Sequence, residues 1–339
     1  MKRLRIELVD LAERGNLTLA LWKAARGRAE QPAVRRWLAE QDRRLNGLAG
    51  EILRGTAPQQ ATRRFTIHDP KRRVISAPCF ADRVLHHAIL NLAEARFEQS
   101  LVDSSFACRP GRGVHASVGA VRSALQRWPW FVQVDVAAYF ESIEHDRLLA
   151  LLARRFKGDD FLALLGRIVH GDGATHGRGL PIGALTSQHF ANAYLDAADR
   201  WLLARPDVRA HARYMDDIAW WCATQEQALV SLAHFSCWIE EALALRLKPG
   251  ATARSSSGGI TWCGFGVSAG RVEPGPRKRR RFLRGANRLA AALREGWAEP
   301  RALQRAHDSL AATLAHTHSL GLRRRCWRAL EDAHGPLEA

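Results

Sequence analysis

Two adjacent acidic residues, Asp216 and Asp217, lie in the apolar and aromatic stretch at residues 213–221. This pattern predicts a tight β-hairpin with both carboxylates at its tip. Neighbouring carboxylates repel each other, so a fold that keeps both ionised near pH 7 usually holds a divalent cation against them. The alternative is an ordinary turn, because aspartate side chains often accept hydrogen bonds from nearby backbone amides.

A third carboxylate strengthens the metal interpretation. Asp135 follows an apolar stretch at residues 131–134 that predicts a β-strand, and the chain then turns into a predicted helix. Such a turn can also offer the Val136 carbonyl as a hard oxygen ligand. Asp135, Val136, Asp216 and Asp217 therefore form a candidate site for two metal ions.

Aromatic and basic side chains accompany these acids. Phe140, or alternatively Tyr139, could lie under the sugar of an incoming nucleotide and exclude a 2′-hydroxyl group by its bulk. Both rings could instead belong to the core. Lys248 could donate a proton to a leaving group. It could equally be a surface lysine whose aliphatic stem covers apolar neighbours.

Residues 63–78 predict two short strands joined by a turn at Asp69 and Pro70. Lys71 and Arg73 lie on and after this turn. Next to a carboxylate-bound metal, they could neutralise the oxygens of a triphosphate. A solvated edge strand protected by charge would carry the same residues, so the sequence leaves both interpretations open.

Two further segments contain glycine-rich turns. Residues 179–188 carry two glycines and a proline before a predicted helix, which Thr186 or Ser187 could cap. Glycine permits close approach of a base or sugar here, although many loops that lead into a helix look the same. Residues 260–266 predict an aromatic turn between short strands, which could form a ledge for a primer end.

The composition indicates a folded protein that binds a polyanion. The chain has 339 residues, so we expect two or three lobes, and its hydrophobic fraction of 47% excludes wholesale disorder. The formal net charge of +17 favours nucleic acid as the partner, because counterions released from the phosphates contribute to binding. An anionic membrane is the competing partner, but the sequence has neither an amphipathic anchor nor an apolar span.

The N-terminal residues bear on where in the cell the protein is located, and the cysteines bear on whether it holds zinc or disulfide bonds. The first seven residues are too charged for the core of a signal peptide, so we expect the protein in the cytoplasm. Six cysteines lack CxxC spacing, which indicates neither a zinc knuckle nor a disulfide framework. We expect them to be buried, small apolar residues.

Helical patterns dominate both ends of the chain. In residues 1–60, one apolar face comprises Val34, Leu38, Leu45, Leu48 and Ile52. The arginines off this face could be solvated, or could contact RNA or a partner protein. From Pro274 onwards the composition shifts to arginine-rich helix, with basic residues available to hold the backbone of a duplex.

Taken in order, these motifs resemble the palm and fingers of reverse transcriptases. Asp135 followed by Phe140 resembles the first metal motif, and residues 179–188 resemble the nucleotide-and-template loop. Residues 214–217 resemble the catalytic hairpin, whereas Lys248 and residues 262–265 resemble the two motifs that follow.

Within this superfamily, the chain resembles the reverse transcriptases of diversity-generating retroelements. Residues 182–188 end in Gly-x-x-x-Ser-Gln, where group II intron enzymes usually have Ser-Pro. Residues 69–73, 82–87 and 107–109 and the size of the chain also resemble that group. Related bacterial enzymes of antiviral or unknown role share parts of the pattern.

The resemblance implies an α+β, right-hand polymerase fold. It implies an N-terminal helical region at 1–60, fingers at 61–130, a palm at 131–270 and a basic helical thumb at 271–339. Part of residues 146–180 could belong to the fingers instead of the palm.

The resemblance also implies two Mg²⁺ ions, for which Mn²⁺ can substitute, held by Asp135, Val136, Asp216 and Asp217, with Lys248 as a further catalytic residue. One ion activates the primer 3′-hydroxyl group and the other stabilises the leaving pyrophosphate. The residues that it assigns to the incoming nucleotide are Lys71, Arg73, Val136, Phe140, Ile182, Gly183 and Gln188. Those that it assigns to the primer and template are Tyr214, Met215, Trp262, Gly264 and Phe265.

We therefore expect an RNA-directed DNA polymerase that performs mutagenic retrohoming. Ile182 stands where many replicative relatives carry glutamine, and isoleucine offers the nucleotide no hydrogen bond, consistent with the error-prone copying of template adenines in this family. The expected partners are a structured template RNA, its RNA/DNA hybrid, dNTPs and a small basic oligomeric accessory protein.

Two alternatives stay open. The enzymatic alternative is a defence-type or other bacterial reverse transcriptase. The other is a basic RNA-binding protein with a vestigial polymerase site, against which the intact Asp135, Asp216 and Asp217 argue.

Overall fold

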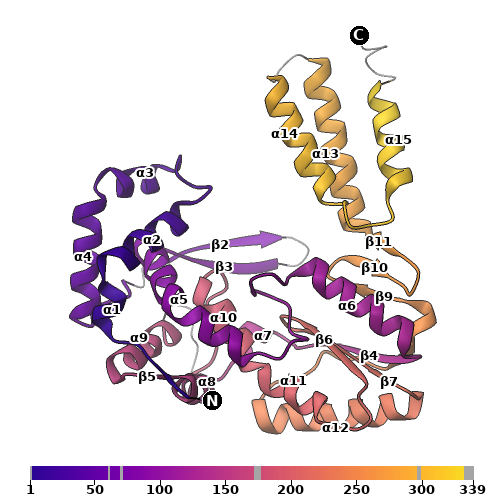
Figure 1. The fold of residues 1–339 in the computed structure, drawn as a ribbon, viewed down its shortest axis with the longest axis horizontal. Helices are drawn as coiled ribbons and strands as arrows, with labels where there is room; N and C mark the ends of the chain where they lie inside the picture. Colours follow the sequence, from indigo (N-terminus) through magenta and orange to yellow (C-terminus); the bar gives the residue numbers. More distant parts are fainter. Residues whose placement is uncertain (1, 60–61, 69–71, 172–176, 296–298, 332–339) are drawn as a thin grey trace.

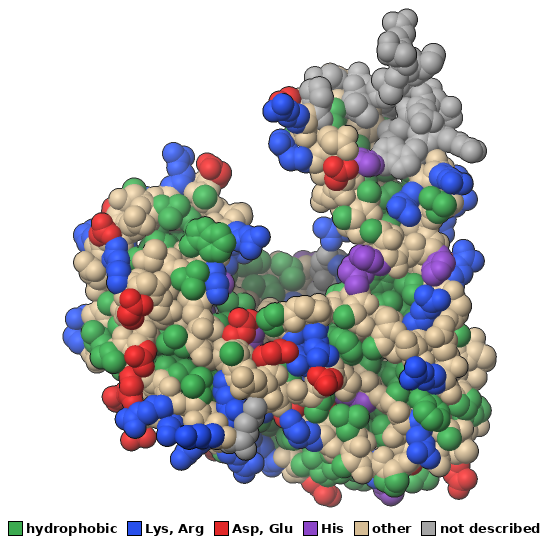
Figure 2. All heavy atoms as spheres, viewed as in Figure 1, with side chains coloured by type: hydrophobic (Ala, Val, Ile, Leu, Met, Phe, Trp, Pro, Cys, Tyr) green, Lys and Arg blue, Asp and Glu red, His purple; other side chains and the backbone are tan. Residues whose placement is uncertain are grey.

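The structure is a computed structural model, and it describes residues 2–59, 62–68, 72–171, 177–295 and 299–331. It has three parts: an N-terminal helical lobe, a central antiparallel sheet between helices, and C-terminal helices that stand on a small second sheet (Figure 1). In the face drawn in Figure 2, the surface is hollowed between the N-terminal lobe and the C-terminal helices. This mixture of helices and antiparallel sheets confirms the predicted α+β class.

The N-terminal lobe consists mainly of helices, as predicted. Val34, Leu45, Leu48 and Ile52 are buried, because apolar residues at helical spacing form one face. Leu38 was predicted on that face, but it is 37% exposed. The elements are β1 (Leu4–Arg5), α1 (Leu8–Ala12), α2 (Arg14–Ala25), α3 (Pro32–Ala39), α4 (Gln41–Leu53) and α5 (Phe80–Ser100).

The predicted strands at residues 63–78 form a hairpin of β2 (Thr62–His68) and β3 (Arg72–Pro78). Phe65 pairs with Ile75 near the middle of the hairpin. In Figure 1 the hairpin extends from the N-terminal lobe towards the C-terminal side of the molecule. The predicted turn at Asp69 and Pro70 lies outside the described residues.

The central sheet has the strand order β6-β7-β4-β8, and its neighbouring strands are antiparallel. Alternate residues of a strand point to opposite faces, so Val132 and Trp220 lie on one face and Phe131 and Trp221 on the other. The strands are β4 (Trp130–Asp135), β6 (Ala210–Tyr214), β7 (Asp217–Cys222) and β8 (Ala253–Ser255).

Helices cover both faces of this sheet. On the Trp220 face, the indole of Trp220 donates to Ser231 of α12 at 2.8 Å. On the Phe131 face, Val121 of α6 belongs to the same buried cluster as Trp221. The helices around the sheet are α6 (Val114–Arg127), α10 (Leu185–Tyr194), α11 (Asp196–Leu203) and α12 (Gln225–Leu243).

Further elements connect the lobes. β1 pairs in parallel with β5 (Phe156–Lys157), so the start of the chain pairs with a segment about 150 residues further on. These elements are α7 (Tyr139–Ser142), α8 (His145–Arg155), β5 (Phe156–Lys157) and α9 (Asp159–Val169).

The C-terminal part begins with a small antiparallel sheet in the order β11-β10-β9. Its strand β11 continues the sheet beyond residue 271, where the thumb was expected to begin; the domain boundaries stay predictions. The elements are η1 (Ser256–Gly258), β9 (Ile260–Trp262), β10 (Phe265–Val267), β11 (Val272–Pro274), α13 (Pro276–Arg294), α14 (Pro300–Ala312) and α15 (Leu320–Glu331).

Within the described ranges, no helix is both long and apolar enough to cross a bilayer.

The cysteines are all free, but the prediction that they are buried is wrong for most of them. Cys222 is buried, Cys237 is exposed and the other four are partly exposed.

Candidate active site

The predicted hairpin around Asp216 and Asp217 is confirmed. Tyr214 ends β6 and pairs with Asp217, the first residue of β7, so Met215 and Asp216 form a two-residue turn. Met215 adopts a left-handed conformation with φ of 56°, which is uncommon outside glycine. The tight turn therefore projects Asp216 at the end of the hairpin.

The same sheet brings Asp135 to this turn. Asp135 ends β4 and lies directly opposite Asp217 of β7. Residues opposite each other on one face of an antiparallel pair have Cβ atoms roughly 4.5–5.5 Å apart. Three acids from two distant segments thus meet at one end of the central sheet.

Asp216 and Asp217 lie in a poorly solvated environment, to which Asp135 adds negative charge. Burial raises the pKa of Asp217 to about 6, and the charges of Asp216 and Asp135 contribute to the rise. Burial also raises the pKa of Asp216, to which the charge of Asp135 adds. One carboxylate oxygen of Asp135, Oδ1, is buried without a hydrogen-bond partner among the described residues.

A lysine provides positive charge at this site. The ammonium group of Lys248 contacts the second carboxylate oxygen of Asp135, Oδ2. This ammonium group lowers the pKa of both Asp216 and Asp217 but does not offset the effects that raise them. Lys248 was predicted close to the reaction, and the structure brings it into contact with a candidate catalytic carboxylate.

The residue types at this site fit a divalent cation. Carboxylate oxygens are the ligands that Mg²⁺ and Mn²⁺ prefer. The unpartnered oxygen of Asp135 and the raised pKa values of Asp216 and Asp217 both indicate a site short of positive charge. In the conformation described, however, no three His, Cys, Asp or Glu side chains of the described ranges are grouped to hold a metal ion. Lys248 contacts Asp135 in that conformation.

Val136 lies directly after Asp135 and is buried. It forms an isolated bridge with Leu247, through hydrogen bonds from the Lys248 amide to the Asp135 carbonyl and from the Ala137 amide to the Arg246 carbonyl, both of 2.8 Å. This bridge does not use the Val136 carbonyl, the predicted ligand. It also fixes the backbone of Lys248 beside Asp135.

The two aromatic residues after Asp135 differ in their surroundings. Tyr139 is buried and its hydroxyl donates to the Ala191 carbonyl, so this ring belongs to the core. Phe140 is half-buried and meets the Tyr139 ring edge to face at a centroid distance of 5.7 Å. Of the two residues considered for the sugar, Phe140 therefore has the more accessible ring.

The loop at residues 179–188 joins this region to the β2–β3 hairpin. The Leu180 amide donates to the Phe140 carbonyl at 2.8 Å, and the Ser76 amide of β3 donates to the Ile182 carbonyl at 2.9 Å. Gly183 has φ of 124°, and a Cβ atom there would lie 2.9 Å from the Ser76 carbonyl oxygen. The loop thus requires glycine where it approaches β3.

The other residues predicted to bind the nucleotide lie around this loop. Ile182 is half-buried, whereas Gln188 and Arg73 are exposed. The thiol of Cys108 lies 3.5 Å from Oε1 of Gln188. Lys71 lies outside the described residues. The prediction that Thr186 or Ser187 caps the helix was wrong. Ala184 occupies the N-cap of α10, and the hydroxyl of Thr186 forms a hydrogen bond with His86.

The aromatic ledge expected at residues 260–266 requires a correction. Trp262 is fully buried and its indole donates to Ser117 of α6 at 2.6 Å, while Phe265 is only 2% exposed. The two residues pair across β9 and β10, so both side chains point into the core beside α6. The side chains of Trp262 and Phe265 therefore cannot form a primer-facing surface.

The turn between those two residues lies beside the catalytic hairpin. Burial raises the pKa of Cys263 to about 12, and the charge of Asp217 contributes to the rise. Burial also raises the pKa of Tyr214, with a further contribution from Cys263. Gly264 follows with φ of 75°. Cys263 was expected to be a buried, small apolar residue, and no cysteine spacing indicated its place beside Asp217.

Tyr214 and Met215, the other residues predicted to contact primer and template, are half-buried at the hairpin tip. Tyr214 packs against the cluster that contains Trp262, and Met215 packs against the main core. Their contacts with a primer stay predictions.

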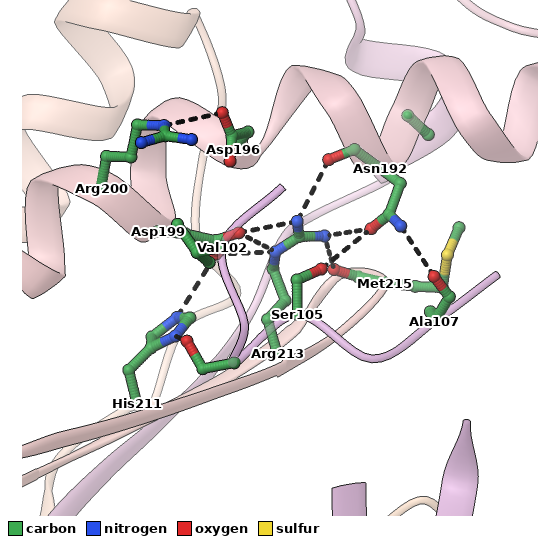
Figure 3. Close-up of polar contacts among 12 residues, drawn as sticks. Val102, Ser105, Ala107, Asn192, Asp196, Asp199, Arg200, His211, Arg213 and Met215 are labelled. Atoms are coloured by element: carbon green, nitrogen blue, oxygen red, sulfur yellow. Dashed lines mark hydrogen bonds and ion pairs between the residues drawn. The ribbon is translucent and has the colours of Figure 1, made fainter. Parts of the chain in front are cut away.

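Sequence reasoning also missed Arg213, which lies in β6 two residues before Met215, the first residue of the turn. Its side chain is fully buried and points towards α10 and α11 (Figure 3). A charged residue at an inward position of a predicted strand was the available indication.

A comparison with protein families agrees with this arrangement. A family model described as reverse transcriptase (RNA-dependent DNA polymerase) matches residues 67–266. This range contains the β3 strand, the loop at residues 179–188, the three carboxylates and Lys248.

Several relatives match parts of the chain. Protein YkfC of Escherichia coli is 28% identical over 50% of this chain and 46% of its own length. The group II intron-encoded protein LtrA of Lactococcus lactis is 26% identical over 44% of this chain and 26% of its own length. The chain thus spans about half or less of these relatives. A structure of apo telomerase from Candida tropicalis, truncated from its C-terminal domain, has a TM-score of 0.47 at 13% identity, covering 64% of this chain and 56% of that one.

Proposed function

The chain belongs to the reverse transcriptases, because the model of that family matches residues 67–266, and we propose that it synthesises DNA on an RNA template at Asp135, Asp216 and Asp217. Its α+β architecture is the right-hand polymerase fold. The observation that carries the proposal is the register of β4 and β7, which pairs Asp135 with Asp217 beside the turn that presents Asp216.

The three carboxylates would hold two divalent cations, with the Val136 carbonyl as a further oxygen ligand. When bound, such ions lower the pKa of an attacking hydroxyl group and neutralise charge on the transferred phosphate. We propose Mg²⁺ as the natural ion and Mn²⁺ as a substitute.

Residues around the carboxylates would orient the nucleotide. Arg73 and Lys71 supply positive charge for the triphosphate, and the half-buried ring of Phe140 would stand against the sugar and exclude a 2′-hydroxyl group. Lys248 would give a proton to the departing pyrophosphate. Its contact with Asp135 supports this role, because it places the ammonium group at the reacting centre.

The proposed biological role is that of a diversity-generating retroelement: error-prone copying of a template-repeat RNA into cDNA with mutations at adenines. The support is the Gly183 to Gln188 motif and the isoleucine at position 182, held by its carbonyl against β3. An isoleucine side chain cannot hydrogen-bond to the nucleotide, so incorrect geometry opposite adenine would be penalised less.

The proposed partners follow from charge and family. A net charge of +17 favours a structured template RNA and its RNA/DNA hybrid, with dNTPs as substrates. A small basic oligomeric accessory protein and a cytoplasmic location stay predictions from the resemblance and the composition.

Sequencing of cDNA made by the purified full chain from its native RNA tests this role, with and without any protein encoded next to it. Substitutions concentrated opposite template adenines support the retroelement role. Faithful cDNA, or polymerisation without a template, would instead favour a defence-type enzyme. Absence of any synthesis on native RNA and on poly(rA)/oligo(dT) would leave a basic RNA-binding protein.

A further inference from the structure

Arg213 is a fully buried charge close to the catalytic turn. Its side chain has no exposed area, and it lies in β6, which ends one residue later at Tyr214, immediately before the Met215–Asp216 turn. In Figure 3 its guanidinium group lies between α11, α10 and the backbone of the hairpin tip. Burial of an arginine destabilises a fold unless all its N–H groups have hydrogen-bond acceptors, so the acceptors of Arg213 indicate its structural role.

Every nitrogen of this guanidinium has an acceptor. Nε donates to both carboxylate oxygens of Asp199 at 2.7 and 2.9 Å, and Nη2 donates to Asp199 Oδ2 at 2.7 Å. Nη1 donates to Oδ1 of Asn192 at 2.7 Å and to the Met215 carbonyl at 3.2 Å. Nη2 also donates to the Asn192 carbonyl at 3.1 Å. A planar fork of five donors is thereby saturated.

The ion pair with Asp199 keeps both partners charged. Burial alone would raise the pKa of Asp199, but the charge of Arg213 and contacts with His211 lower it to about 2. Burial alone would lower the pKa of Arg213, yet Asp199 raises it. The guanidinium is therefore a fixed cation, and its position is set by α11.

Backbone contacts hold a further segment against the same strand. Residues 104–106 run parallel to β6, since the Arg213 amide donates to the Ser104 carbonyl at 2.9 Å and the Phe106 amide donates to the Arg213 carbonyl at 3.0 Å. The side-chain amide of Asn192 donates to the Ala107 carbonyl at 2.7 Å. Asn192 thus links Arg213 to this segment as well.

The helix that carries Asn192 also carries a candidate nucleotide residue. Asn192 and Gln188 are four residues apart on α10, so they lie on the same side of that helix. α10 begins directly after the loop whose Ile182 and Gly183 contact β3. A displacement of α10 relative to the hairpin would change the distance between the nucleotide loop and the carboxylates.

We propose that Arg213 is a positioning residue that fixes the Met215–Asp216 turn relative to α10, and so sets the distance between the carboxylates and the nucleotide loop. This inference rests on the proposed polymerase function. Met215 has an uncommon left-handed backbone, and its carbonyl is the one on the turn that Arg213 binds. Without this hydrogen bond the turn has fewer constraints on its conformation.

The test compares Arg213→Lys with Arg155→Lys in the full chain. A lysine keeps the charge, but its single ammonium group cannot reach Asp199, Asn192 and Met215 together. Arg155 is the matched control, because it is mostly buried and pairs with Asp196 of the same helix α11. Arg155 also bonds to Ser100, away from the catalytic hairpin.

Three measurements are made on each protein. The first is kcat and KM for dTTP on poly(rA)/oligo(dT), per active site counted from the burst of the first turnover. The second is the Mg²⁺ concentration at half-maximal rate. The third is hydrogen exchange of the backbone amides at residues 214–218, without metal or nucleic acid, which needs no activity.

We expect Arg213→Lys to lower kcat by about 10- to 100-fold, because small displacements of reacting groups have effects of that size. KM for dTTP and the Mg²⁺ midpoint rise, and residues 214–218 exchange faster. Arg155→Lys changes none of these quantities per active site, even if its melting temperature falls as much.

Equal effects of the two substitutions on kcat, KM and exchange would overturn the proposal and leave Arg213 a purely structural residue. If Arg213→Lys does not fold, Asn192→Ala takes its place. It keeps the Asp199 pair but removes the side-chain link to α10, and it is expected to shift the results of the same three measurements less. A wild-type protein that never incorporates dTTP refutes the polymerase function, whereas the exchange measurement still decides whether Arg213 holds the turn.

Discussion

Asp135 at the end of β4 lies directly opposite Asp217 at the start of β7. A shift of this pairing by one residue would turn one of the two carboxylates to the opposite face of the sheet. The site therefore depends on the register of the central sheet, which Val132 and Trp220 fix by their burial against α12. The ammonium group of Lys248 is bound to Asp135 and supplies a positive charge within this group of acids.

Replacement of Lys248 by methionine tests its role as a proton donor. We expect the single-turnover rate of dNTP incorporation to fall by about 10²–10⁴-fold, the usual contribution of a general acid. The Mg²⁺ concentration at half-maximal rate does not rise, because the substitution removes the ammonium group that contacts Asp135 in the wild-type protein.

The matched control is Lys157→Met, since Lys157 lies in β5 outside the site. An unchanged rate in Lys248→Met, measured by rapid quench, would show that the contact with Asp135 serves only to balance charge.

Gly183→Ala tests the contact between the nucleotide loop and β3. The new methyl group would lie 2.9 Å from the Ser76 carbonyl oxygen at a φ of 124° that side chains rarely adopt. We expect KM for dNTPs to rise because the loop is displaced from β3 and Arg73.

Gly177→Ala is the control, because Gly177 also has a positive φ, but a methyl group there would lie more than 4 Å from its neighbours among the described residues. If steady-state kinetics gave an equally raised KM for both variants, strain at a positive φ rather than the contact with β3 would be the cause of the increase.

Ile182→Gln tests the proposed cause of low fidelity. Glutamine adds an amide that can hydrogen-bond to the nucleotide, so we expect fewer substitutions opposite template adenines. Ile182→Leu keeps the side chain apolar and should leave the error spectrum unchanged. Sequencing of cDNA from each variant makes the comparison, and an unaltered spectrum in Ile182→Gln removes Ile182 from the explanation.

Asp199→Asn tests the buried ion pair with Arg213. Because the pKa of Asp199 is about 2 in the folded chain and about 3.9 in an unfolded one, its contribution to stability is fully present above the unfolded value. We expect the substitution to cost about 3–5 kcal/mol near pH 7, as it leaves Arg213 buried without its counter-charge. This difference narrows as the pH falls from about 4 towards 2, because Asp199 takes up a proton in the unfolded chain over this range while it stays largely ionised in the folded one.

Urea unfolding of both proteins across this pH range measures the difference. Asp42→Asn is the control, since Asp42 pairs with Arg14 at the surface, and its effect should stay below about 1 kcal/mol. A constant difference between wild type and Asp199→Asn at every pH would contradict the lowered pKa of Asp199 in the folded state.

The features predicted correctly from the sequence are those that local patterns encode. The apolar and aromatic residues around Asp216 and Asp217 predicted the hairpin, and an apolar stretch predicted the strand that ends at Asp135. The strands of the β2–β3 hairpin were also recognised from their composition and turn.

The features that were missed depend on packing between distant segments. The aromatic residues Trp262 and Phe265 suited a primer surface as well as a core, and only α6 beside them decides for the core. Arg213 could not be paired with Asp199, because the partner belongs to another element. The contact between Lys248 and Asp135 depends on the bridge at Val136, which joins segments far apart in the chain.

The most direct test of the central claim is Mg²⁺-dependent incorporation of dTTP on poly(rA)/oligo(dT) by wild type and by Asp216→Ala, with RNA affinity measured on the same samples. We expect wild type to incorporate dTTP and Asp216→Ala to have no detectable incorporation, with nearly equal RNA affinity because the basic surface is unchanged. Incorporation by Asp216→Ala at the wild-type rate would contradict the assignment of catalysis to the acids of β4 and the hairpin.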